Sequence, residues 1–287
     1  MEIAKITKKI ARRIIRILPK GKSLFIKLIL KLSGPEFKDI IKVSDGRKFY
    51  IDRIKPINKG IFFNDIFEPE ITELIRRIVK PGDVAFDFGA NLGWHTTLLS
   101  SLVGNHSGHV YAFEISDVIV KELRKNLEIN DCRNVCVEEM AIGDKIGEVK
   151  YYDFDDIGMA NLSPDLGGGT SNKTEKLVAM TTLDDYRIAN KISRLNFIKC
   201  DIDGTEDMFL AGAKKTLACF KPKIIIEVEQ STQKMYGHGT SYILRELEKH
   251  GYRFKSIEEG KHPDEFPEIF ADKIPDDFSG NVYCFQT

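Results

Sequence analysis

From residue 84 onward the hydrophobic positions follow two alternating patterns. Short, almost continuous apolar stretches such as KIIIEVE are typical of strands buried on both faces. Stretches with apolar residues three and four positions apart are typical of helices. The strands expected are 84–88, 109–113, 135–139, 195–200, 223–229, 252–257 and 281–286, and the helices expected between them are 92–103, 117–129, 206–218 and 241–250. This alternation predicts a doubly wound, Rossmann-like α/β fold with a mostly parallel seven-stranded sheet.

Other segments depart from this alternation. EPEITELIRRIVKPGD predicts a helix with Pro69 in its first turn and Pro81-Gly82 ending it. Residues 35–67 indicate short strands and turns, with RKFYID as the clearest extended piece. Residues 153–176 and 258–277 are predicted to be long surface loops, which in a compact domain are usually functional or disordered.

The first 34 residues form a separate segment with isoleucines at helical spacing and basic residues between them. Residues 1–32 contain ten Lys or Arg and one acid, which predicts a basic amphipathic helical extension. Such a helix suits an anionic membrane surface, where each basic side chain adds about 1 kcal/mol, but it also suits packing on its own domain. We therefore divide the chain into this extension (1–34), an N-terminal subdomain with its leading helix (35–80) and a main domain (81–287).

Composition narrows the class of protein. Apolar residues make up 42% and charged residues 30%, as in soluble globular proteins. No apolar run reaches the length of about 18 residues that a membrane span needs. The five cysteines form no C-x-x-C pair, which favours reduced thiols and a cytoplasmic location, with a peripheral position on the inner membrane face as the alternative. Outside residues 1–32 the chain is net acidic and has no basic stripe, so no nucleic-acid partner is expected.

The stretch VAFDFGANLGWHT carries the first candidate chemistry. It leads a strand into a turn containing Gly89, Asn91 and Gly93. It lacks the lysine of a phosphate-binding loop and does not match the G-x-G-x-x-G turn of dinucleotide-binding folds. Asp87, two residues before the first glycine, is poorly placed beside a pyrophosphate and suits a cationic ligand instead.

S-adenosylmethionine (SAM) is a cationic ligand of this kind, with an ammonium, a sulfonium and two ribose hydroxyls. Glu114, at the end of the strand in HVYAFEIS, can accept hydrogen bonds from both ribose hydroxyls. The adenine edge would lie near Met140, Ala141 and Ile142. The cofactor contacts predicted are Asp87, Gly89, Asn91, Gly93, Thr96, Glu114, Ala141 and Ile142.

These motifs resemble the FkbM-type SAM-dependent methyltransferase family. The matching pieces are FEPEIT, PGDVAFDFGANLGWHT, HVYAFEIS, NVCVEEMAIGDKIGEV, TTLDDY, NFIKCDIDGTEDMFLAGA and PKIIIEVE, in order over roughly residues 62–229. The resemblance implies a class I SAM-dependent methyltransferase fold, SAM as the cofactor, and O-methylation of a sugar or a glycosylated natural product. The family often has a glutamate where this chain has Asp203.

The ends of the later strands supply candidates for removing the acceptor's proton. Asp201 and Asp203 follow the strand 195–200 and are the first candidates for a base, with His238 in a glycine-flanked loop as a further one. His95 is a weaker candidate that would contact the methionine end of SAM. Alternatively, Asp201, Asp203 and Glu227 could bind Mg²⁺, which takes oxygen ligands and would acidify a hydroxyl.

The leading functional hypothesis is therefore O-methylation of a sugar hydroxyl in a glycan, glycolipid or glycosylated metabolite. Two alternatives from other classes stay open: a nucleic-acid-modifying methyltransferase that uses the basic extension, and a non-catalytic glycan-binding protein with a SAM fold.

Overall fold

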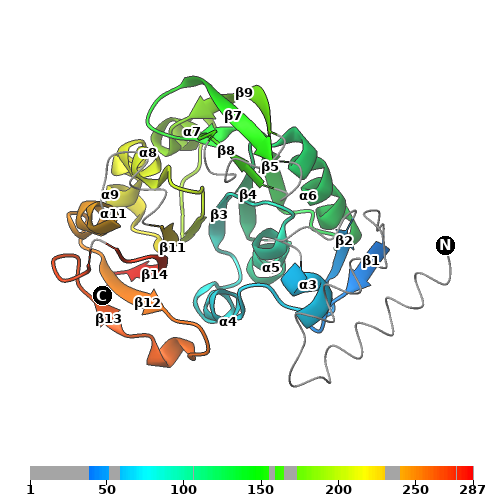
Figure 1. The fold of residues 1–287 in the computed structure, drawn as a ribbon, viewed down its shortest axis with the longest axis horizontal. Helices are drawn as coiled ribbons and strands as arrows, with labels where there is room; N and C mark the ends of the chain where they lie inside the picture. The colour runs from blue at the N-terminus through cyan, green and yellow to red at the C-terminus, as the bar shows by residue number, and fades with distance from the viewer. Residues whose placement is uncertain are drawn as a thin grey trace.

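The computed structural model describes residues 39–51, 59–105, 107–154, 159–164, 173–229, 240–275 and 277–286. At its centre is an eight-stranded sheet in the order β13-β12-β14-β11-β10-β3-β4-β5 (Figure 1). Five adjacent strands are parallel: β11 (Lys223–Val228), β10 (Phe197–Cys200), β3 (Val84–Phe88), β4 (His109–Phe113) and β5 (Val135–Glu138). β14 (Gly280–Phe285) runs antiparallel between β11 and β12 (Arg253–Ile257). All seven predicted strands are present, and the two-residue strand β13 (Glu268–Ile269) adds an edge.

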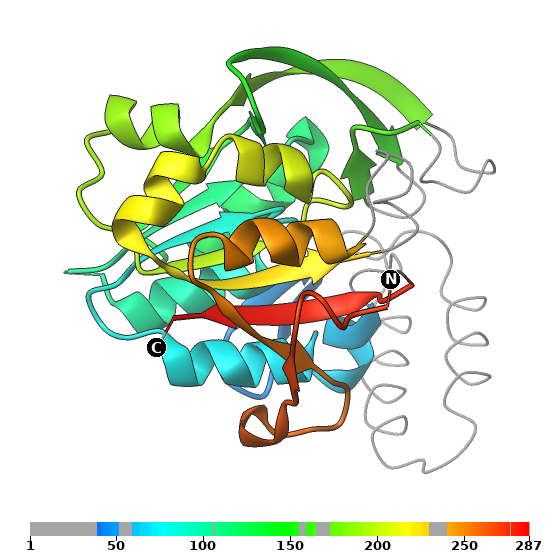
Figure 2. The ribbon, with the colours of Figure 1, turned by 90° about the vertical axis from the view of Figure 1, so that its left-hand side faces the viewer.

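Helices cover both faces of this sheet, because side chains alternate along each buried strand. Phe86 belongs to a core that includes residues of α7 (Leu183–Ala189), α8 (Glu206–Ala211), α9 (Lys214–Phe220) and α11 (Thr240–Glu248). Its neighbour Ala85 packs with α4 (Pro69–Ile78) and α5 (Trp94–Val103) on the opposite face, where α6 (Asp117–Ile129) packs on Ala112. Figure 2 shows the layers, with α11 and α4 on opposite sides of the sheet. The doubly wound α/β fold with a mostly parallel central sheet is thus confirmed.

A small N-terminal unit packs against the start of α5. β1 (Asp39–Lys42) and β2 (Lys48–Ile51) form an antiparallel hairpin, and α3 (Lys59–Asn64) follows, a helix that the sequence did not predict. Phe49 stacks on Trp94 with ring centroids 5.1 Å apart, and Arg47 donates to the Trp94 carbonyl and to Thr97 Oγ1 (2.9 Å). The predicted extension, residues 1–34, lies outside the described residues. Within the described residues, no helix has the length and apolar character needed to cross a bilayer.

Within the segment predicted as a loop at 153–176, most of the described residues belong to strands of a second sheet. We call this unit the inserted sheet: β6 (Ala141–Ile142), β9 (Lys173–Thr181), β7 (Gly147–Phe154) and β8 (Met159–Asn161), in that order. Val178 and Met180 of β9 pack with Tyr151 of β7, while neighbouring β9 residues are exposed. The loop prediction was wrong here because only one face of these strands is apolar. The other predicted loop, 258–277, contains the short helix η2 (Pro263–Glu265) and β13.

The single helix predicted at 206–218 is also wrong, because the chain forms α8 and α9 with a break between them. Gly212 lies at this break, and a Cβ there would be 2.0 Å from the carbonyl oxygen of Gly143. The break allows the turn between α8 and α9 to approach the residue that follows β6.

Candidate active site

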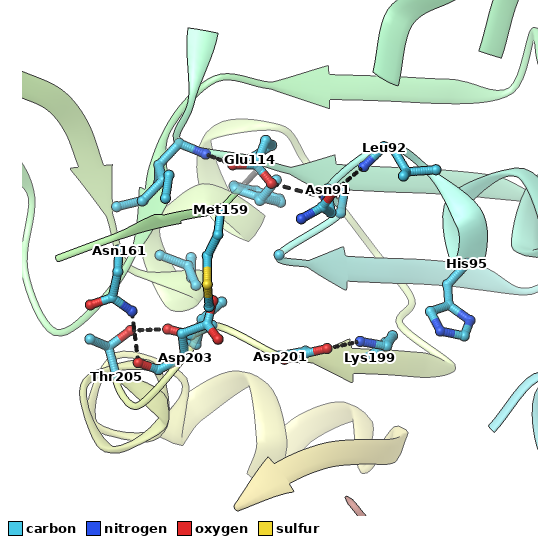
Figure 3. A pocket seen from close by; sticks show the side chains of 18 of the residues that line it. Asn91, Leu92, His95, Glu114, Met159, Asn161, Lys199, Asp201, Asp203 and Thr205 are labelled. Carbon is cyan, nitrogen blue, oxygen red and sulfur yellow. Dashed lines mark hydrogen bonds and ion pairs between the residues drawn. The ribbon is translucent and has the colours of Figure 1, made fainter. Parts of the chain in front are cut away.

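A cavity of about 1030 Å³, counted to its open mouth, lies at the carboxyl ends of β3, β4 and β10 (Figure 3). The turn after β3 and the loop after β10 form part of its wall, β6 and β8 of the inserted sheet line another part, and Ile61 and Phe67 of the N-terminal unit line a third. Ligand binding at this edge is what the sheet topology predicts.

The turn after β3 depends on glycine because two loops approach closely. Gly89 has φ +78°, and a Cβ on it would lie 1.8 Å from the carbonyl oxygen of Asp201. Gly93 has φ +91°, and its Cβ would meet Leu123 of α6 at 2.7 Å. Asn91, at φ +47°, also lines the cavity. Neighbouring protein atoms therefore already leave no room for a side chain at Gly89 or Gly93, whether or not a ligand is bound.

Asp87 lies beneath this turn and is 1% exposed. Its Oδ2 accepts a hydrogen bond from Thr96 Oγ1 (2.6 Å), whereas its Oδ1 has no hydrogen-bond partner among the described residues. Burial raises the pKa of Asp87, and Lys199, His95 and Thr96 oppose this rise. Thr96 is fully buried and orients Asp87. One buried carboxylate oxygen thus remains without a partner within the described ranges, although neither Asp87 nor Thr96 is among the residues that line the cavity.

Glu114 fixes the opposite side of the turn. Its Oε2 accepts from the backbone N–H of Asn91 (2.9 Å), and its Oε1 accepts from those of Ile115 (2.9 Å) and Ser116 (3.0 Å). Burial raises the pKa of Glu114 to about 7, despite these three bonds. Ala141 and Ile142 line the neighbouring part of the cavity, together with Phe113 and Met140. The result is a carboxylate beside an apolar slot, which suits a ribose attached to a flat base.

Three carboxyl groups gather beside the Gly89 turn. One oxygen each from Asp201, Asp203 and Glu227 lie within 4.8 Å of one another. Lys199 is 2% exposed, and its Nζ lies 2.6 Å from Asp201 Oδ2. Burial alone would raise the pKa of Asp201. The positive charge of Lys199 and a hydrogen bond from Glu227 outweigh burial, so the pKa of Asp201 is lowered. The charge of Asp201, together with burial, raises the pKa of Glu227, which favours the neutral form of Glu227.

This cluster brings together the three predicted magnesium ligands, but its charge is already balanced from within. The Lys199 ammonium pairs with Asp201, and the raised pKa of Glu227 favours its neutral form. A divalent cation would have to overcome both effects, and only these three ligand groups meet in the described part of the chain. Magnesium binding therefore stays a prediction, and the chemistry below does not depend on it.

Sequence reasoning missed several groups that line the cavity. Lys199 had a signal, since a charged residue within the apolar strand NFIKC needs a partner when buried. Asn161 and Met159 reach the cavity from β8, in the segment interpreted as a loop. His95, the weaker candidate of the sequence analysis, also lines the cavity, and its Nε2 lies 2.7 Å from Glu68 Oε2. His238, the other predicted base, lies outside the described residues.

A family model described as the methyltransferase FkbM domain matches residues 87–254, which is more than half of the chain. The chain belongs to the FkbM methyltransferase family. The match begins at Asp87 and includes the glycine turn, Glu114, the inserted sheet and the loop after β10, so the whole cofactor side of the cavity falls within it.

This FkbM-family chain is also similar to individual proteins. Over 120 residues it is 32% identical to a protein-L-isoaspartate O-methyltransferase of Methanothrix thermoacetophila, covering 41% of this chain and 54% of that protein. It is 19% identical to methyltransferase FkbM from Methylobacillus flagellatus, whose crystal structure gives a TM-score of 0.47. That similarity covers 79% of this chain and 50% of the Methylobacillus protein. It is 17% identical to the crystal structure of a SAM-dependent O-methyltransferase of Thermotoga maritima, with a TM-score of 0.43. That similarity covers 91% of this chain and 81% of the Thermotoga protein. The chain thus spans about half the length of the first two relatives, and TM-scores this low say nothing about a shared substrate.

Proposed function

We propose that this FkbM-family chain transfers the methyl group of SAM to a hydroxyl oxygen of a sugar in a glycan, a glycolipid or a glycosylated metabolite. The observation that carries the proposal is the meeting, in one cavity, of Glu114 beside an apolar slot and of two carboxyl groups, Asp201 and Asp203. Family membership supports methyl transfer, and the chemistry of the cluster supports a neutral, hydroxyl-bearing acceptor.

The residues of the cofactor side fit SAM. Asp87 Oδ1 is a buried acceptor without a partner in the described chain, as the cationic end of SAM requires. Glu114 would accept from the ribose hydroxyls, and the slot at Ala141 and Ile142 would hold the adenine. When bound, SAM supplies an electrophilic methyl group on a sulfonium. The chain's own residues then have to hold the acceptor oxygen in line with that methyl.

The acceptor side favours a sugar over an anion. Asp201 and Asp203 line the cavity, and carboxylates are strong acceptors for sugar hydroxyls. Lys199, the lysine in the cavity lining, is already paired with Asp201 and so does not favour a carboxylate acceptor such as the L-isoaspartate group named for the Methanothrix relative. Across the cavity, Ile61, Phe67 and Trp94 offer apolar surface to the C–H faces of a sugar ring.

Asp203 is the better of the two candidate bases. Asp201 is tied to Lys199 and to the Glu227 proton, which makes it a poor proton acceptor. Burial and the negative charge of Asp201 raise the pKa of Asp203 well above its usual range. A bound sulfonium would favour the ionised form of Asp203, which could then take the proton of the attacking hydroxyl.

The test is incubation of the protein with isotopically labelled SAM and a cell glycan and glycolipid extract, followed by mass spectrometry of the labelled products. The expected result is a labelled methyl ether on a sugar, with the rate strongly reduced in Asp203→Asn. Label on protein carboxyl groups, on nitrogen or on nucleic acid would overturn the sugar assignment. Failure of S-adenosylhomocysteine (SAH) to bind in calorimetry would overturn methyl transfer itself.

We also propose that residues 1–32 bring the enzyme to anionic membranes that carry glycolipid acceptors, on the strength of their ten basic residues alone. Sedimentation with phosphatidylglycerol vesicles tests this. Removal of residues 1–32 should abolish binding, and unchanged binding would refute the proposal.

A further inference from the structure

The loop after β10 holds Asp203 in an uncommon backbone conformation. Asp203 has φ +52°, in the left-handed region, where a non-glycine residue costs about 1–2 kcal/mol. Such a residue persists only where surrounding contacts fix it. The contacts that fix Asp203 therefore determine where its carboxylate lies.

Most of these contacts come from the residues that follow Asp203 in the same loop. Glu206 Oε1 accepts from the backbone N–H groups of Gly204 (3.2 Å) and Ile202 (3.3 Å), and Thr205 Oγ1 donates to the Ile202 carbonyl (3.2 Å). These bonds stabilise the turn on both sides of Asp203. They leave its own carbonyl to be satisfied from elsewhere.

That carbonyl is held by the inserted sheet. Asn161, at the end of β8 and 2% exposed, donates from Nδ2 to the Asp203 carbonyl oxygen (2.8 Å). Its Oδ1 accepts from the backbone N–H of Ser163 (2.6 Å), so the amide orientation is set by a donor on one side and an acceptor on the other. Figure 3 shows Asn161 and Asp203 facing each other at the cavity wall.

We propose that Asn161 is a positioning residue for Asp203, through which the inserted sheet sets the geometry of the acceptor side of the cavity. The inference rests on the proposed function, in which Asp203 takes the acceptor's proton. β8 also contributes Met159 to the cavity lining, so one short strand both contacts the ligand space and holds the loop that bears the base. A shift of β8 would therefore move Asp203 as well.

The test uses Asn161→Asp and Asn161→Ala, with Asn190→Asp as a matched control. Asn190 Nδ2 donates to the Tyr186 carbonyl (3.0 Å) at the end of α7, away from the cavity, so its variant loses the same kind of bond. With labelled SAM and the glycan extract, both Asn161 variants should methylate at least tenfold more slowly than wild type at saturating SAM. Their SAH dissociation constants should stay within about threefold of wild type, and Asn190→Asp should match wild type in both measurements.

A wild-type rate in a folded Asn161 variant would overturn the proposal, and so would a loss of SAH affinity as large as the loss of rate. A second measurement needs no acceptor: hydrogen exchange of the Gly204 amide should speed up at least tenfold in both Asn161 variants and stay unchanged in Asn190→Asp. Unchanged exchange in the Asn161 variants would refute the positioning role. If the wild-type protein methylates nothing in the extract while exchange behaves as expected, the proposed function fails and the positioning of Asp203 stands.

Discussion

Replacing Gly89 by alanine tests whether the two loops at the cavity floor must touch. The backbone cost of φ +78° for alanine is about 1–2 kcal/mol. The new Cβ would also lie 1.8 Å from the Asp201 carbonyl oxygen, so the loops must separate by more than an ångström. Overpacking of this kind adds about 1–3 kcal/mol. We therefore expect a total loss of about 2–5 kcal/mol in the free energy of unfolding.

Gly46 provides the control because it has φ +92° and, among the described residues beyond its chain neighbours, no heavy atom within 4 Å of where an alanine methyl would lie. Gly46→Ala should lose only the backbone contribution. At about 2–4 °C per kcal/mol, Gly89→Ala should melt about 2–12 °C below Gly46→Ala in differential scanning calorimetry. Isothermal titration should show SAH affinity at least tenfold weaker in Gly89→Ala alone. Equal melting temperatures and equal affinities in the two variants would refute the close approach as the reason for this glycine.

Three further outcomes follow from the charges of the site. Since burial raises the pKa of Glu114 to about 7, its carboxylate is ionised above that pH and protonated below it. The SAH dissociation constant should therefore rise up to about tenfold for each pH unit below pH 7. A dissociation constant that does not change with pH would contradict this. Asp87→Asn should melt higher than wild type at pH 7, because burial raises the pKa of Asp87 and makes its charge destabilising. The same variant should bind SAM about ten- to a hundredfold more weakly, since a charge-assisted hydrogen bond contributes about 1.5–3 kcal/mol. A melting temperature below that of wild type would be inconsistent with this reasoning. EDTA should leave the methylation rate unchanged, because Lys199 already pairs with Asp201 and the raised pKa of Glu227 favours its neutral form. A loss of rate that Mg²⁺ restores would show that a metal takes part.

The place of Asp87 and Glu114 at one edge of the sheet could be predicted from the sequence because it depends on strand ends. Once β3 and β4 are recognised from their apolar runs, Asp87 and Glu114 necessarily come to the same edge of a parallel sheet. What the sequence could not tell is which atoms fill the space left by a glycine. At Gly89 and Gly93 these are Asp201 and Leu123, and only the folded chain brings them there.

The acceptor side was harder to predict because its parts come from segments without a strong period. β9 buries Val178 and Met180 but exposes most of its other residues, and it pairs with β7 across residues that were interpreted as a loop. Asn161 therefore had no predicted element to belong to. The residue itself gives no signal, since an asparagine after MA in a polar stretch is equally typical of a turn.

The hairpin packed against α5 has a consequence for how this fold can be divided. Trp94, in the first turn of the helix that follows the glycine turn, stacks on Phe49, and its Nε1 donates to Thr72 Oγ1 (3.0 Å), while Arg47 holds its carbonyl. All three partners precede residue 87, where the family match begins. A chimera that exchanges only the matched region between two relatives would separate Trp94 from the residues that support it. Exchange between relatives should therefore treat the β1–β2 hairpin, α4 and the cofactor turn as one inherited unit.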